Sequence, residues 1–217
     1  MQRLRIKYSR GPELKYLAHL DLMRLWERAL RRAEVPLSYS EGFSPHARIS
    51  VAAPLAVGVT SEAELMDVFL GRRLSPFYFG TRVSRQLPRG ISVSQAEEVP
   101  LTAPSLQSAV RFADYRVQVA GPVAKDELET AIQRLLDMAE LPWQHQRDKE
   151  VKSYDLRALI DDVYVQGQQD GLWLLEMRLV CDSRGTGRAE QVTAALGLKD
   201  YPSSIHRTRL TLASGRE

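Results

Sequence analysis

The sequence predicts an α+β protein built from two tandem ferredoxin-like βαββαβ units with antiparallel sheets. Two observations support this fold. First, the hydrophobic period alternates between about 2 and about 3.6 residues in the order strand, helix, strand, strand, helix, strand, and that order occurs twice. Second, residues 99–110 carry no charge and contain two prolines, which is typical of an interdomain linker. We therefore expect a basic N-terminal domain over 1–98, a linker over 99–110 and a C-terminal domain over 111–217.

The first unit begins with an alternating strand pattern over 3–9 and changes to a helical period over 20–34. Pro36 ends this helix, because the residue before a proline disfavours helical geometry. Ser75 followed by Pro76 is a typical helix start. The remaining predicted elements are strands at 47–55 and 63–70, a helix from Pro76 to about Leu87 and a strand at 91–97.

The second unit repeats this order. Asp170 and Gly171 form a dipeptide that strongly favours a tight hairpin turn between two strands. The stretch 150–166 is open to two interpretations, because it looks extended although 156–162 could form a helical turn. The predicted elements are strands at 112–120, 150–166, 171–181 and 204–212, and helices at 125–141 and 188–196.

The composition is that of a globular protein. Of 217 residues, 44% are hydrophobic and 26% are charged, which argues against a disordered or fibrous chain. No apolar run approaches the roughly 18 residues of a membrane helix, and the N-terminal residues lack the apolar core of a signal peptide. The single cysteine, Cys181, excludes an internal disulfide, a cysteine zinc cage and a cysteine-ligated iron–sulfur cluster. We expect a soluble, cytoplasmic protein without a metal or cofactor of its own.

Positive charge is concentrated in the first half of the chain. Residues 1–110 hold 15 Lys and Arg against 10 Asp and Glu, a net charge of +5, whereas 111–217 have a net charge of −2. Of the 30 basic residues, 24 are arginines, whose planar fork suits bidentate recognition of phosphate or carboxylate. A coding bias toward arginine explains that preference equally well. The asymmetry between the halves favours an acidic partner for the first half.

The first predicted helix places a stripe of arginines opposite its Trp26 side. Such a stripe could follow a nucleic-acid backbone. Alternatively it is an ordinary solvated face, partly neutralised by Asp21, Glu27 and Glu34. The four residues of the stripe are Arg24, Arg28, Arg31 and Arg32.

The segment 39–48, which follows this helix, is the most distinctive in the chain. Phe43 could stack on a base while the adjacent glycine lets a backbone approach a phosphate, or Phe43 could fill the core. His46 is a weak candidate for metal-free acid–base catalysis on a phosphodiester, because topology places it near two arginines after the third strand. These residues complete the predicted nucleic-acid site: Phe43, His46, Arg48, Arg72 and Arg73.

A second anion site is predicted where the chain passes from strand to helix, at Arg184, Gly185, Gly187 and Arg188. Glycines there free backbone amides, which attract anions. A tight strand-to-helix turn explains the same glycines. The segment matches neither a P-loop nor a dinucleotide-binding fingerprint. Gly-x-Ser-x-Gly and His-Glu-x-x-His are also absent from the sequence, so a triad hydrolase or a self-contained metalloenzyme is not expected.

Several motifs resemble the bacterial radical-SAM-linked proteins, a family of uncharacterised function encoded beside, or fused to, a radical SAM protein. In the first half they are His19-Leu20-Asp21, Arg28-Ala29-Leu30-Arg31-Arg32-Ala33, Tyr39-Ser40-Glu41-Gly42-Phe43-Ser44-Pro45-His46 and Pro54-Leu55-x-x-Gly58. The second half adds Asp155-Leu156-Arg157, Gly185-Thr186-Gly187-Arg188 and His206-Arg207-Thr208. The resemblance implies a companion protein, often encoded near RNA-processing and ribosomal genes, whose radical chemistry belongs to the partner chain.

The expected architecture is also similar to that of RAMP-type CRISPR endoribonucleases, a likeness of fold that does not carry function. The favoured function is a non-catalytic RNA-binding companion that presents RNA to a radical SAM enzyme. One alternative is a protein–protein adaptor that docks its basic face on that enzyme. A metal-independent endoribonuclease using His46 and a small-ligand site between the units are further alternatives.

Overall fold

The computed structural model describes residues 1–147 and 150–213 and divides them into two compact units. Unit 1 contains Met1–Val110 together with Leu212 and Ala213, and unit 2 contains Arg111–Thr211. The α+β class with antiparallel sheets is confirmed. The predicted linker and domain boundaries stay predictions, and the contacts group 99–110 with unit 1.

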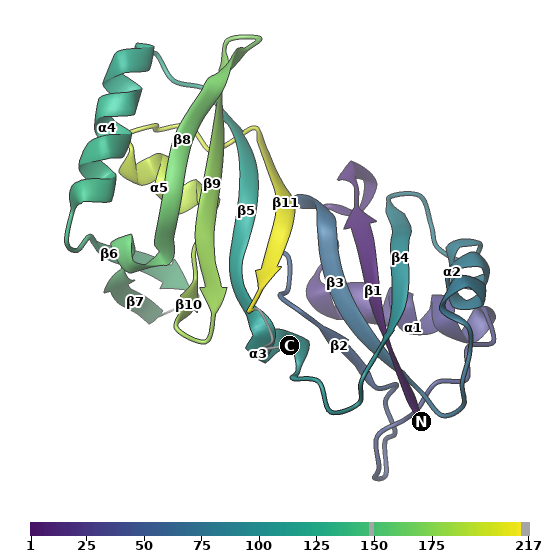
Figure 1. Ribbon diagram of the computed structural model, residues 1–217. Helices are drawn as coiled ribbons and strands as arrows, with labels where there is room; N and C mark the ends of the chain where they lie inside the picture. Colours follow the sequence, from purple (N-terminus) through teal and green to yellow (C-terminus); the bar gives the residue numbers. More distant parts are fainter. Residues whose placement is uncertain (148–149, 214–217) are drawn as a thin grey trace. The chain divides into compact units, whose positions relative to one another are not determined.

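Unit 1 follows the predicted order of strands and helices (Figure 1). Its strands pair in the order β2-β3-β1-β4, and each described pairing is antiparallel. This is the ferredoxin-like strand order. A short 3₁₀ turn, η1 (Pro12–Leu14), follows the first strand. The main elements are β1 (Gln2–Arg10), α1 (His19–Arg32), β2 (Ile49–Val51), β3 (Thr60–Leu70), α2 (Pro76–Ser84) and β4 (Ile91–Val99), followed by the short α3 (Leu106–Ala109).

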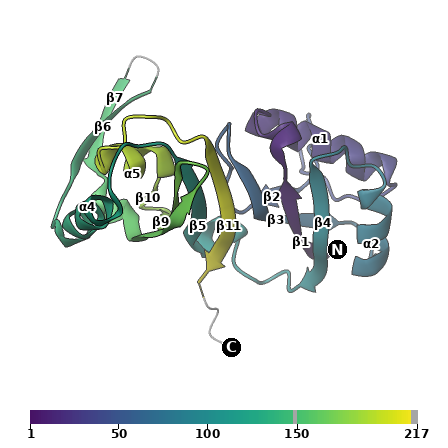
Figure 2. The same cartoon turned by 90° about the horizontal axis from the view of Figure 1, so that it is seen from above.

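Both α1 and α2 pack on one face of this sheet (Figures 1 and 2). In β1 and β3 the alternation puts the even-numbered residues into the shared core, which in β1 are Leu4, Ile6 and Tyr8. Trp26 of α1 meets Tyr8 edge-on, with ring centroids 5.0 Å apart. The apolar side of α1 is therefore buried in the core, and its opposite side, which carries the arginines, faces solvent.

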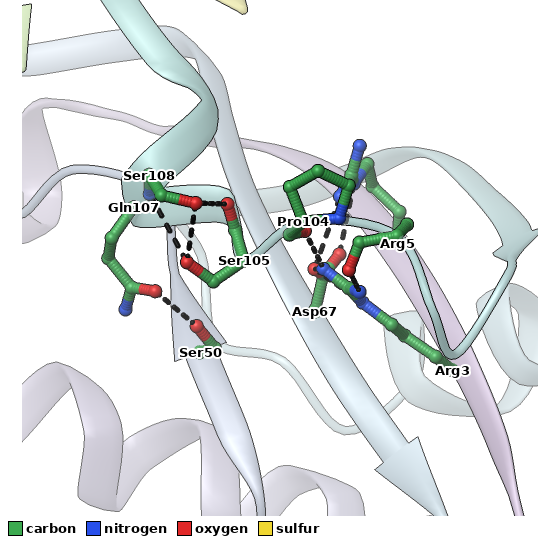
Figure 3. A network of polar contacts seen from close by, with 9 residues as sticks. Arg3, Arg5, Ser50, Asp67, Pro104, Ser105, Gln107 and Ser108 are labelled. Carbon is green, nitrogen blue, oxygen red and sulfur yellow. Dashed lines mark hydrogen bonds and ion pairs between the residues drawn. The ribbon is translucent and has the colours of Figure 1, made fainter. Parts of the chain in front are cut away.

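The odd-numbered residues of β1 and β3 lie on the other face of the sheet, where a buried ionic network forms (Figure 3). Arg3 Nε donates to Asp67 Oδ2 over 2.8 Å, and Arg5 Nε donates to Asp67 Oδ1 over 3.0 Å. Arg3 also donates to the carbonyl oxygens of Ala103, at 2.6 Å, and Pro104, at 2.8 Å. The network thus fixes the chain after β4 against the sheet.

The segment after this network is also ordered by local bonds (Figure 3). The Ser105 side chain accepts the Ser108 amide over 3.2 Å and caps α3. Gln107 Oε1 accepts from the Ser50 hydroxyl over 2.9 Å. The chain returns to this point at its other end, since the Ala213 amide donates to the Ala109 carbonyl over 2.6 Å.

Unit 2 has the same order of main elements, with additional short strands. Its sheet runs β8-β9-β5-β11, again the ferredoxin-like order, and β10 pairs with the end of β9. Figure 1 shows α5 behind these strands and α4 beside β8. The elements are β5 (Val110–Val119), α4 (Lys125–Asp137), β6 (Pro142–Arg147), β7 (Glu150–Asp155), η2 (Arg157–Leu159), β8 (Ile160–Gln169), β9 (Leu172–Asp182), β10 (Gly185–Thr186), α5 (Ala189–Ala195) and β11 (Ser204–Leu212).

Several predicted boundaries are wrong in detail. The strand expected at 47–55 shrinks to Ile49–Val51, since Pro54 and Gly58 interrupt the chain that follows. The helix expected at 125–141 ends at Asp137, because Met138 is already extended and Pro142 begins a strand that pairs with β7. The helix expected to reach Leu87 ends at Ser84.

Two further differences concern unit 2. The stretch 150–166 is not one strand but two, β7 and β8, separated by the η2 turn, so the alternative of a helical turn is confirmed. The strand β6 has no counterpart among the predicted elements. The predicted turn is confirmed, with Asp170 at φ 50° and Gly171 at φ 77°, both in the left-handed region that such hairpins require. Among the described residues, no helix is both long enough and apolar enough to span a membrane.

Candidate nucleic-acid interface

A groove of about 580 Å³ lies between α1 and the segment that follows α2 in unit 1. We call it the arginine groove. Its charged lining residues are Asp21, Arg24, Arg28, Arg32 and Arg85. The three arginines of α1 are spaced four residues apart, which places them one above another on the same side of the helix. Arg85 is the residue that caps the C-terminal end of α2, and it lines the groove on the side opposite α1.

The groove carries a net charge of +3, because only one carboxylate lines it. That carboxylate, Asp21, accepts from Arg24 Nη1 over 3.1 Å in an exposed pair. Among the residues that the structure describes, Arg28, Arg32 and Arg85 have no carboxylate within 4.0 Å. Within the groove, neutralisation by a carboxylate therefore applies to Arg24 alone, and the choice between a binding stripe and a solvated face stays a prediction. Glu34 pairs with Arg82 at 2.6 Å, outside the groove.

Arg31, the fourth arginine of the predicted stripe, does not line the groove. Its guanidinium carbon lies 5.9 Å from the centroid of the Tyr39 ring. This is a weak cation–π contact, and it directs Arg31 toward the segment after α1. The structure thus brings together three of the four arginines of the stripe and adds Arg85, which sequence analysis missed. The signal available in the sequence was a basic residue in the last turn of the second predicted helix.

The segment 38–48 folds back on itself as an irregular hairpin, which we call the 38–48 hairpin. The Ser40 amide donates to the His46 carbonyl over 2.9 Å, and the Arg48 amide donates to the Ser38 carbonyl over 2.8 Å. Its tip contains Gly42 at φ 117°, a backbone conformation that favours glycine. Phe43, beside it, is fully exposed at 111% of its reference area. The alternative in which Phe43 fills the core is therefore wrong.

The other predicted residues near this hairpin differ in their contacts. Arg48 stacks on Phe69, with its guanidinium carbon 4.6 Å from the ring centroid. Arg73 forms an exposed ion pair with Glu98 at 2.8 Å, whereas Arg72 has no carboxylate partner in the described part of the chain. No described contact joins these arginines to His46, so their grouping with His46 stays a prediction.

His46 is exposed, and its backbone amide donates to the Ser40 hydroxyl over 3.0 Å. Its imidazole has no hydrogen-bond or ion-pair partner among the described residues. General acid–base catalysis usually needs a second group that orients the imidazole. Nothing in the described hairpin supplies one.

The predicted anion site of unit 2 lines a second pocket, of about 660 Å³. Its cationic side chains are Lys152, Arg184 and Arg188. Two of them have carboxylate partners. Arg184 pairs with Asp182 at 2.9 Å, and its hydrogen bond holds the pKa of that carboxyl below the usual range, while Arg188 lies 3.9 Å from Glu190. The charge of this pocket is largely compensated, unlike that of the arginine groove.

The glycines of this second site are required by packing. A Cβ atom on Gly187 would lie 2.6 Å from the Leu159 carbonyl oxygen and 2.9 Å from Leu179 Cβ. A Cβ atom on Gly185 would lie 2.9 Å from Leu159 Cδ2. Such distances are shorter than any normal carbon contact. The turn therefore packs directly on η2, which explains the glycines without a bound anion.

Comparison with family models identifies the chain. Residues 3–189 match the model of a family described as "Uncharacterized protein conserved in bacteria" (DUF2344). This protein belongs to that family. The description names neither a radical SAM partner nor a CRISPR endoribonuclease, so both stay predictions. No curated protein is similar enough in sequence to be a match.

Solved structures share the fold at low sequence identity. A chain of the crystal structure of a Cbf5-Nop10-Gar1 complex is 10% identical, with a TM-score of 0.52 over 95% of this chain and 48% of that one. A chain of an H/ACA RNP bound to a substrate RNA containing 2'-deoxyuridine is 12% identical, with a TM-score of 0.50 over 95% of this chain and 47% of that one. This chain thus spans about half the length of those it matches.

Proposed function

We propose that this protein is a non-catalytic RNA-binding protein whose first unit holds the RNA backbone in the arginine groove. The observation that carries the proposal is the gathering of Arg24, Arg28, Arg32 and Arg85 around one groove that contains a single carboxylate. Each nucleotide carries one negative charge, and arginine recognises phosphate oxygens through two parallel hydrogen bonds. Four guanidinium groups in one concavity, three of them without a carboxylate partner among the described residues, therefore suit a polyanion.

The 38–48 hairpin supports an RNA ligand because it presents an aromatic ring to solvent. Phe43 is fully exposed at the hairpin tip, where it makes no contribution to the core. Aromatic rings of this kind stack on unpaired bases, which is the usual way in which proteins bind single-stranded RNA. Arg31 and Tyr39 lie at the base of the hairpin and add a cation beside a second exposed ring.

The likeness of fold to solved structures is also compatible with RNA binding. One matched chain comes from an RNP solved with a substrate RNA, as its description states. At 10% to 12% identity the likeness extends to the fold alone. RNA binding by this chain is therefore argued from its own arginines, and the shared fold is compatible with it.

We place this activity beside a radical SAM enzyme, to which the protein would present RNA for modification. The resemblance of the Tyr39–His46 segment to radical-SAM-linked proteins supports that partner. The single cysteine of this chain, Cys181, is buried and could not hold a three-cysteine cluster, so the radical chemistry would belong to the partner.

Binding of a structured RNA across a salt series tests the proposal. The affinity of four arginine–phosphate contacts, at about −0.7 each, should fall with salt concentration on a log–log slope of about −3. Absence of binding at low salt, or binding with a flat slope, would contradict it. RNA incubated with the parent protein or with His46→Ala should stay intact, and cleavage by the parent alone would favour an endoribonuclease.

A second candidate, a protein–protein adaptor for the radical SAM partner, is favoured by the exposed aromatic residues of α2. Phe77 is 82% exposed and Tyr78 is 49% exposed. Exposed aromatic residues of this kind are enriched in protein interfaces. Association of the two proteins that survives nuclease treatment would support the adaptor, and failure to associate at micromolar concentrations would contradict it.

A further inference from the structure

The arginine groove is not purely ionic, because apolar side chains also line it. These apolar lining residues, which we call the apolar floor, are Leu17, Leu25, Ala29, Leu87 and Pro88. Ala29 belongs to the buried core, and the three leucines pack against that core while remaining partly accessible. A ligand that offered only phosphates would leave this apolar surface in contact with water. The groove therefore suits a ligand with both an anionic and a flat apolar part.

The spacing of the arginines suggests how such a ligand lies. Arg24, Arg28 and Arg32 succeed one another at intervals of four residues, so their Cα atoms rise by about 6 Å per step along α1. Successive phosphates of one nucleic-acid strand are separated by a comparable distance. A strand laid along α1 could thus place consecutive phosphates on consecutive arginines, with Arg85 closing the groove from the other side.

We propose that the arginine groove takes an unpaired segment of single-stranded RNA, with one base against the apolar floor and the flanking phosphates on the arginines. The proposal rests on the proposed RNA-binding function and names its substrate class. The volume of about 580 Å³ lies within the range of about 300–1,000 Å³ that is usual for small-molecule sites, so a single nucleotide fits. Arginine also stacks on the faces of bases, which gives the rim a second contact with the same nucleotide.

A duplex cannot use the groove in this way. Its bases are stacked and paired inside the helix, so that its outer surface offers phosphates and sugars but no base face. An acidic peptide would satisfy the arginines through carboxylates, yet it would leave the floor uncovered unless apolar residues alternated with the acids. The combination of a cationic rim and an apolar floor favours the unpaired nucleotide.

Three probes of equal length test the assignment on the full chain: an oligouridylate of about eight nucleotides, the same strand annealed to its complement, and an abasic ribose-phosphate chain. Fluorescence anisotropy should show the single strand binding at least about tenfold more tightly than the other two. The abasic probe has the same charge as the oligouridylate, so this difference isolates the base. It also needs no variant that risks unfolding the protein.

A pair of matched variants locates the site. Arg28→Ala combined with Arg85→Ala removes two groove cations without touching the core, since both side chains are exposed. Arg134→Ala combined with Lys199→Ala removes the same charge from exposed positions of unit 2. The groove variant should lose at least about tenfold in affinity for the oligouridylate, and the control should change much less.

The outcomes separate this inference from the proposed function. Binding of all three probes with equal affinity, or an oligouridylate affinity unchanged in the groove variant, would overturn the inference while leaving RNA binding intact. Failure to bind oligouridylate or any structured RNA would overturn both. Equal affinity for polyglutamate and oligouridylate, lost for both in the groove variant, would overturn the inference in favour of the adaptor.

Discussion

Arg3 donates from Nε to Oδ2 of Asp67 over 2.8 Å, and both side chains are buried on the sheet face opposite the helices. The same carboxylate accepts from Arg5 at 3.0 Å. Two guanidinium groups therefore depend on one carboxylate inside unit 1. Arg3 in turn fixes the carbonyl oxygens of Ala103 and Pro104, so the pair links the sheet to the chain that leaves it.

Asp67→Asn should destabilise unit 1 strongly. It leaves Arg3 buried without a counter-charge, and removal of one partner of a buried pair costs about 3–5 kcal/mol. Urea unfolding followed by tryptophan fluorescence measures the effect, since Trp26 lies in the unit 1 core. Asp21→Asn, in an exposed pair, should change the free energy of unfolding by less than about 0.5 kcal/mol. Equal stability of the two variants would contradict the role of the network.

Gly187→Ala should destabilise unit 2 by about 1–3 kcal/mol or more, because the added methyl group would collide with the backbone at Leu159. Gly167→Ala is the matched control within the same unit, since nothing lies within 4 Å of its Cβ position. Thermal unfolding of both variants provides the comparison. If Gly187→Ala were as stable as Gly167→Ala, the turn would not pack as tightly as described, and its glycines would be free for another role.

Arg85→Ala and Arg73→Ala should differ in their effect on RNA binding. Arg85 lines the arginine groove without a carboxylate partner among the described residues, so its loss should reduce the salt slope by about 0.7. Arg73 is already paired with Glu98 at 2.8 Å, so its loss should change the slope less. Measurement of the affinity for one RNA at about 50–200 mM salt decides between them. The reverse order would place the RNA outside the groove.

Phe43→Ala should separate binding from stability. The ring is fully exposed, so the free energy of unfolding should change by less than about 0.5 kcal/mol. If the ring stacks on a base, RNA binding should weaken by about 1–3 kcal/mol. Phe79→Ala provides the opposite case, because that side chain is fully buried and its removal should cost about 3–5 kcal/mol of stability. Unchanged RNA affinity of Phe43→Ala would remove the hairpin tip from the interface.

The strands and helices that depend on local patterns were predictable from the sequence. The alternation in β1 and the helical period of α1 are properties of consecutive residues, and both appear in the structure within two residues of the expected limits. Elements that depend on pairing between separate segments were not predictable in this way. The strand β6 exists because it pairs with β7, and the helical pattern before it extends to 141, past the end of α4 at Asp137 and up to the first paired residue, Pro142.

In the candidate site, too, the features set by a local pattern were predictable and those set by tertiary packing were not. The helical angle predicts that Arg24, Arg28 and Arg32 share one side of α1. It does not predict that Arg85 approaches them from the end of α2, or that Tyr39 draws Arg31 toward the hairpin. Both facts depend on how separate elements pack together. The partners of an arginine are set by tertiary structure, which no window of a few residues contains.

The return of the chain to unit 1 at Leu212 and Ala213 makes unit 2 an insertion in the sequence of unit 1. A single cut after Val110 would give a C-terminal fragment that still carries the Ala213 amide, whose acceptor at Ala109 stays on the other fragment. Complete excision of unit 2 therefore requires two cuts. Conversely, a short artificial loop that joins Val110 directly to Leu212 offers the cleanest way to isolate the basic half with both of its ends in place.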